Sequence, residues 1–215
     1  MTAHAGGASL LPPSSSFDRN AVRREMRACR RELSPRHRDL ASNRFVTLAL
    51  RMRALQPGRR IALYFAYGAE ADPSELLQRA LRMGCAIYLP TITDHRAKRM
   101  RFARYEGGTN LVRNRYGIPE PDKKRRVFVS ARHLDVIFVP LVAVDSQGNR
   151  IGSGAGFYDR ALKHLHAGRR WRRPKLVGIA FECQRLAQIP SHPWDVPLDA
   201  LITEKTFYRF TPRMR

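Results

Sequence analysis

A chain of 215 residues suits one compact domain, and a hydrophobic content of 43% provides enough apolar surface for a core, which excludes a wholly disordered protein. Lys and Arg total 40 against 18 Asp and Glu, so the formal net charge is +22, and only six of the 40 are lysines. This charge predicts attraction to polyanions, whether phosphate ligands or nucleic acid, but it says nothing about the fold.

The cysteines and the hydropathy pattern exclude several further classes. Cys29, Cys85 and Cys183 are widely spaced and form no CxxC pair, so neither a zinc knuckle nor a disulfide framework is predicted. Free thiols of this kind fit a reducing compartment. No apolar run approaches the roughly 20 residues of a membrane helix, and the N-terminus lacks the features of a secretory signal. We therefore expect a cytoplasmic protein without a membrane segment.

The N-terminal part of the chain divides into a tail and a pair of helices. Residues 1–16 are rich in Gly, Pro and Ser, which predicts a disordered tail before a single domain at 17–210. From position 17 to about 55, apolar residues recur at helical spacing. Asp18 and the pair Ser34 and Pro35 are typical first residues of helices, so two helices are expected.

The next segment predicts a β–α–β unit. The apolar run 61–67 is typical of a strand that is buried on both faces, as in a parallel sheet. The sequence 72–75, Asp-Pro-Ser-Glu, starts a helix that Gly84 ends, and 86–90 forms the following strand. Short connections of this kind favour parallel pairing.

Further strands alternate with helical segments along the rest of the chain. The expected strands are a half-exposed one at 101–105 and buried ones at 134–140, 176–181 and 197–203, with a loop at 106–126, a turn at 146–149 and a helix from about 159 to 166. This alternation predicts an α/β sandwich around a mostly parallel sheet.

The segment 149–160 is the richest in chemistry. Gly152, Gly154 and Gly156 alternate just before a helix, so the backbone can approach a ligand closely and point its amides at an anion. Arg150 could add a fixed cation to a phosphate, and Asp159 could hold Mg²⁺. The spacing matches neither a Walker loop nor a dinucleotide fingerprint, and a tight structural turn remains an alternative explanation of the glycines.

The glycine loop and its surroundings resemble the 5-formyltetrahydrofolate cyclo-ligase (5,10-methenyltetrahydrofolate synthetase) family. The resemblance covers roughly residues 18–205, in the segments 19–34, 64–72, 116–121, 135–140, 145–159, 177–181 and 195–199. It implies a three-layer α/β/α sandwich, similar to the ribose-5-phosphate isomerase and CoA-transferase group, preceded by the helical pair. It also implies an ATP- and Mg²⁺-dependent enzyme that converts 5-formyltetrahydrofolate to 5,10-methenyltetrahydrofolate with release of ADP and phosphate, through an imidoyl phosphate.

The resemblance also implies roles for individual residues. ATP would contact Arg19, Arg23, Arg150, Ile151, Gly152, Ser153, Gly154, Ala155, Gly156, Phe157 and Tyr158. The folate substrate would contact Phe65, Glu70, Ser153, Gly154, Ala155, Gly156 and Phe157. Asp159 and Asp199 match the carboxylates that hold Mg²⁺, and Arg150 and Asp159 are the expected catalytic pair.

Family members often carry basic residues at the positions of Ser153 and Ala155, which this chain lacks. Backbone amides and Arg150, or another arginine that reaches in, would then bind the phosphates. Two alternatives stay open. The basic runs 123–126 and 169–173 favour a protein that binds RNA or other nucleic acid. The missing basic residues of the loop favour an inactive homologue that only binds nucleotide or folate. Nonspecific attraction to nucleic acid is expected in any case from the net charge.

Overall fold

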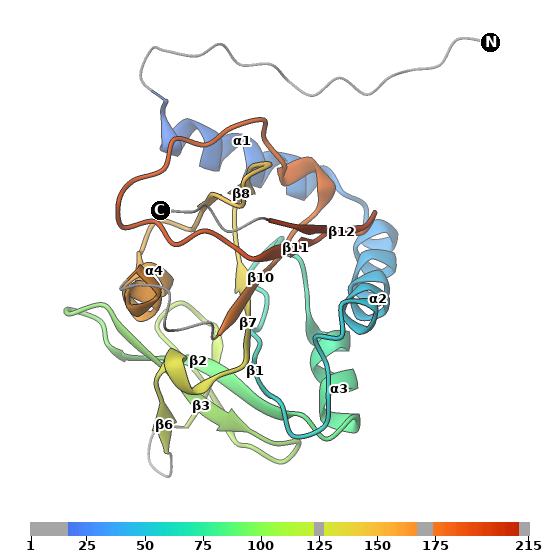
Figure 1. The fold of residues 1–215 in the computed structure, drawn as a ribbon, viewed down its shortest axis with the longest axis vertical. Helices are drawn as coiled ribbons and strands as arrows, with labels where there is room; N and C mark the ends of the chain where they lie inside the picture. Colours follow the sequence, from blue (N-terminus) through green and yellow to red (C-terminus); the bar gives the residue numbers. More distant parts are fainter. Residues whose placement is uncertain (1–16, 123–126, 167–173, 211–215) are drawn as a thin grey trace.

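The computed structural model describes residues 17–122, 127–166 and 174–210 (Figure 1). The predicted tail at 1–16 and the two basic runs at 123–126 and 169–173 lie outside these residues. Within them, no helix is long and apolar enough to cross a membrane. The cytoplasmic location remains a prediction.

A sheet of eight strands forms the centre of the described structure. Its spatial order is β12 (Phe207–Arg209), β11 (Ala200–Ile202), β10 (Lys175–Ile179), β7 (Val136–Pro140), β1 (Arg60–Ala62), β2 (Ala86–Asp94), β3 (Arg99–Tyr105) and β6 (Phe128–Val129). The five strands from β11 to β2 are parallel, whereas β12, β3 and β6 pair antiparallel at the edges. The predicted mostly parallel sheet is confirmed.

Helices cover both faces of this sheet, which confirms the α/β/α prediction. Figure 1 shows α2 (Pro35–Arg51) and α3 (Ser74–Arg82) on one side and α4 (Phe157–Leu162) on the other. Alternate residues of β7 explain the layers, because Val136 and Phe138 join the core under α2 and α3 while Ile137 and Val139 join the core that contains Leu162 of α4. The strand is therefore buried on both faces, as its apolar run predicts.

The N-terminal helix α1 (Arg19–Glu32) lies apart from these layers, across the end of the sheet where the short strand β8 (Ala143–Val144) is found (Figure 1). The Asp18 carboxylate accepts a hydrogen bond from the Asn20 amide (2.7 Å), so Asp18 is the cap expected from the sequence. Val22 and Met26 bury one stripe of the helix against Val142 and Ile151. This small core holds α1 in place beside the loop that follows β9 (Arg150–Ile151).

A disulfide bond joins Cys29 of α1 to Cys183 of the 3₁₀ helix η4 (Glu182–Gln184), and Cys85 is a buried free thiol. The expectation of three free thiols is therefore wrong. The two bonded residues are 154 positions apart, and they meet only because the fold packs α1 against η4. No spacing rule could reveal this pair from the sequence.

Candidate active site

A cavity of about 910 Å³ opens at the carboxyl ends of β1, β2 and β7. Tyr64 and Phe65 line it just after β1, Leu89 lines it within β2, and Leu141 and Val142 line it after β7. The chain continues from β1 to its neighbour β2 on one side, while β7 lies on the other side of β1. Such a topological switch point is where open parallel sheets form their ligand crevice.

A tight hairpin delivers Arg150 and the glycine loop to this cavity. Strands β8 and β9 pair antiparallel, and the buried Asp145 carboxylate accepts hydrogen bonds from the amides of Gln147, Asn149 and Ile189 at 2.8–3.0 Å. Gly148 takes the left-handed conformation that the turn requires (φ 81°). The predicted turn at 146–149 is thus fixed by one carboxylate, and the chain leaves it toward the cavity.

The glycine loop itself lines the cavity from Gly152 to Asp159. Gly154 has a φ of 109°, and a side chain there would also lie 3.7 Å from the Arg23 guanidinium carbon. Gly156, at φ 72°, is the N-cap residue that precedes α4. The 3.7 Å distance to Arg23 is an ordinary van der Waals contact, so it is the positive φ that requires glycine at 154.

Arginines of α1 reach this loop across more than 120 positions of sequence. The Arg23 Nε donates to the Gly152 carbonyl at 3.0 Å, and Arg27 donates to the Ser153 carbonyl at 3.3 Å. Arg19 donates to Asp195 at 2.6 Å and is part of the cavity lining with Arg23. The loop that lacks its own basic residues is therefore flanked by guanidinium groups from another element.

Arg150 and Asp159 form an ion pair in the cavity wall, with Nη2 and Oδ1 2.5 Å apart. The Arg150 side chain is 4% exposed and its Nε has no partner among the described groups, whereas Asp159 is 31% exposed. The expected catalytic pair is thus brought together, with the carboxylate facing the solvent side. A buried cation with an unused donor is suited to a phosphate oxygen.

Another part of the cavity lining is apolar and acidic. Phe65 packs edge-to-face on Tyr105 with ring centres 6.1 Å apart, and the Glu70 carboxylate accepts a hydrogen bond from the Tyr67 amide at 3.1 Å. Burial raises the pKa of Glu70, while that hydrogen bond and the charges of two α1 arginines, Arg30 and Arg27, oppose the rise. This end of the cavity is suited to the N–H groups of a flat heterocycle.

Two predicted residues lie elsewhere. Ile151 is fully buried and packs on α1 behind the cavity wall. The Asp199 carboxylate accepts a hydrogen bond from the Leu176 amide at 2.7 Å, at the amino end of β10, whereas the cavity lies at the carboxyl ends. The structure therefore does not bring Asp199 to Asp159, and the described residues contain no cluster of three metal-binding side chains.

The cavity is also lined by residues for which the sequence predicts no individual role. They include Lys98, Asn114, Tyr116, Glu120, Trp194 and Asp195. Two of them, Tyr116 and Glu120, come from the 116–121 segment, whose resemblance to the family is a usable signal. Trp194 is 63% exposed and stacks on His192, with ring centres 4.7 Å apart.

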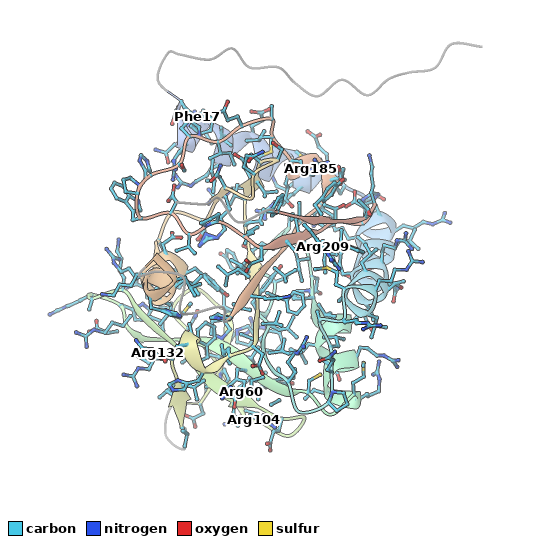
Figure 2. The ribbon with its side chains drawn as sticks, viewed as in Figure 1. Phe17, Arg60, Arg104, Arg132, Arg185 and Arg209 are labelled. Carbon is cyan, nitrogen blue, oxygen red and sulfur yellow. A yellow bond between two sulfur atoms is a disulfide. The ribbon has the colours of Figure 1, made fainter. Side chains whose placement is uncertain are left out.

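The positive charge extends well beyond the cavity. Figure 2 shows Arg185 near α1, while Arg60, Arg104 and Arg132 lie at the opposite end of the view. Arg60 begins β1, so it lies at the amino end of the sheet. The labelled arginines thus do not gather at one end of the molecule in this view.

The sheet, the switch-point cavity and the arginine-flanked glycine loop define an α/β protein with a candidate site for an anionic ligand. Residues 15–204 match the sequence profile of the 5-formyltetrahydrofolate cyclo-ligase family. The chain therefore belongs to that family, and with it to the folate-dependent ligases of one-carbon metabolism.

Individual relatives agree with this assignment. The 5-formyltetrahydrofolate cyclo-ligase of Haemophilus influenzae is 33% identical over 84% of this chain and 94% of its own length, and that of Escherichia coli K12 is 32% identical over 83% and 96%. The solved structure of the Aquifex aeolicus 5,10-methenyltetrahydrofolate synthetase superposes with a TM-score of 0.75 at 28% identity and covers 92% of this chain and 95% of that one.

Proposed function

We propose that this chain converts 5-formyltetrahydrofolate to 5,10-methenyltetrahydrofolate and uses MgATP to do so, releasing ADP and phosphate. One observation carries the proposal. A single cavity joins the glycine loop, flanked by Arg23 and Arg150, to the apolar end that contains Phe65 and Glu70. A phosphate donor and a pterin can therefore lie next to each other in the same enclosure.

The chemistry explains why both ends are needed. The formamide oxygen on N5 is a poor leaving group, so the γ-phosphoryl group is transferred to it and an imidoyl phosphate forms. The N10 lone pair then attacks the formyl carbon, N10 loses its proton, and the C–O bond breaks so that phosphate leaves with the electron pair. The arginines and loop amides would neutralise the charge on the transferred group.

The residues present suit a magnesium ion that arrives with the nucleotide. Mg²⁺ prefers one or two carboxylates together with phosphate oxygens, and Asp159 offers a carboxylate with one oxygen outside its ion pair. Bound there, the ion would supply charge neutralisation between the phosphates. Asp199 is left out of this proposal because its carboxylate is bonded at the other end of the sheet.

The test is an absorbance assay for methenyltetrahydrofolate with purified protein and 5-formyltetrahydrofolate. Product should appear only when both ATP and Mg²⁺ are present, and removal of Mg²⁺ with a chelator should stop it. An absence of product under conditions where ATP still binds would support the inactive, ligand-binding homologue instead.

A further inference from the structure

The carboxylates of the cavity are not equivalent in their partners. Asp159 is paired with Arg150, and Asp195 is paired with Arg19. Glu70 and Glu120 also line the cavity, and neither has an ion-pair partner among the described residues. In the proposed function Glu70 binds the pterin, so Glu120 is a buried carboxylate without an assigned role.

Glu120 belongs to β5 (Pro119–Pro121) and is only 5% exposed. Its Oε1 accepts two hydrogen bonds, one from the Ile92 amide at 3.2 Å and one from the Asn114 side-chain amide at 2.8 Å. Its Oε2 has no protein donor in the part of the chain that the structure describes. A carboxylate buried to this extent is rarely left without a cation, so the free oxygen marks a place for a ligand group.

The reaction itself produces a cation. The pterin of 5-formyltetrahydrofolate is uncharged at N5. After N10 has attacked, lost its proton and expelled phosphate, the N5 lone pair is shared over the new N5–C–N10 unit, and the product is an amidinium ion with one positive charge. The other groups that line the cavity include Arg19, Arg23, Arg150 and Lys163, which oppose such a charge.

We propose that Glu120 is a catalytic residue whose Oε2 faces this amidinium and stabilises the positive charge that develops during ring closure. The inference rests on the proposed function, because the cation arises only in that reaction. Two features suit Glu120 to the task. It is held rigidly through Oε1, and it is buried where a fixed charge acts more strongly than in water.

The decisive variant is Glu120→Gln. The glutamine carbonyl can still accept the bonds from Ile92 and Asn114, so the fold should keep its melting temperature, while an uncharged N–H group replaces Oε2. We expect kcat to fall roughly 10- to 100-fold. Binding of the cationic 5,10-methenyl compound should weaken by a similar factor, and binding of the neutral 5-formyl compound should change less than threefold.

Glu106→Gln is the matched control, since Glu106 follows β3 and its side chain is 71% exposed and, among the described residues, pairs only with Arg104, outside the cavity. It should leave kcat and both affinities unchanged. Because the ratio of the two folate affinities is measured by titration without turnover, it tests Glu120 separately from the overall reaction. Failure of the wild-type chain to form product would reject the proposed function, whereas an unchanged affinity ratio in Glu120→Gln would reject the role of Glu120.

Discussion

Asp159→Asn separates the chemical role of this carboxylate from its structural one. Asparagine keeps a side-chain oxygen that can accept the hydrogen bond from Arg150, but it removes the negative charge. Because Arg150 is 4% exposed and Asp159 is 31% exposed, the pair is only half-buried. Complete removal of one partner from a fully buried pair costs about 3–5 kcal/mol, so a variant that keeps a neutral hydrogen bond here should lose about 1 kcal/mol.

A loss of about 1 kcal/mol corresponds to a fall in melting temperature of about 2–4 °C for a domain of this size. Turnover should fall at least about 100-fold, since the negative charge that we propose to hold the nucleotide's magnesium is gone. The assay combines thermal unfolding with the methenyl absorbance rate at several Mg²⁺ concentrations. Asp159→Ala is the comparison, and it should unfold at a lower temperature because Arg150 loses its only acceptor among the described groups. Normal turnover in Asp159→Asn at unchanged Mg²⁺ dependence would refute the metal assignment.

Three further experiments test other parts of the site. Arg23→Met should raise the ATP KM about tenfold or more, because a hydrogen bond from a charged group is worth roughly 1.5–3 kcal/mol. The folate KM should stay within about twofold, and equal rises in both KM values would assign Arg23 to packing alone. Reduction of the Cys29–Cys183 bond should lower the free energy of unfolding by roughly 2–5 kcal/mol, as measured in urea, since the bond links positions 154 apart; an unchanged midpoint would contradict the bond. The folate KM should rise as the pH falls through the pKa of Glu70, which burial raises, because the protonated acid loses acceptor capacity. Since the pKa of Glu70 is higher in the folded chain than in the unfolded chain, ionisation of this carboxyl opposes folding. Glu70→Gln should therefore be more stable than the parent at a pH above the raised pKa, and this gain should disappear below the unfolded-state pKa. The folate KM of the variant should not change with pH, and a pH-dependent KM would exclude Glu70 as the titrating group.

The central layers of the fold could be predicted because they depend on local patterns. The run at 134–140 becomes β7 with both faces buried, and Asp18 and Ser34 cap the helices that they precede. The region 106–126 was expected to be a loop, yet it contains β4 (Leu111–Arg113) paired with β5. Three residues are too few to show a period of two, and the pairing is fixed partly by the side-chain contact of Asn114 with Glu120.

In the candidate site, too, local sequence patterns predict some residues, while only the fold places others. The glycine loop, Arg23, Phe65 and Glu70 all line the cavity, and the sequence carries them in recognisable segments. The position of Asp199 could not be predicted from the sequence, because forty positions separate it from Asp159. Only the direction of the strands shows whether a residue lies at their amino or their carboxyl ends. The Asp199 carboxylate accepts a hydrogen bond from the Leu176 amide of β10, a structural role.

The net charge takes on a more specific meaning once α1 is placed. A lysine within the glycine loop would put its charge on a mobile side chain of the same segment. Arg23 and Arg27 instead bring guanidinium groups from α1. This helix is held in place by a small core, by two hydrogen bonds to the loop and by a disulfide. The geometry of the proposed anion site thus depends on how α1 docks. It follows that nucleotide binding and docking of α1 should stabilise each other, since a ligand that binds only the docked state favours that state by mass action.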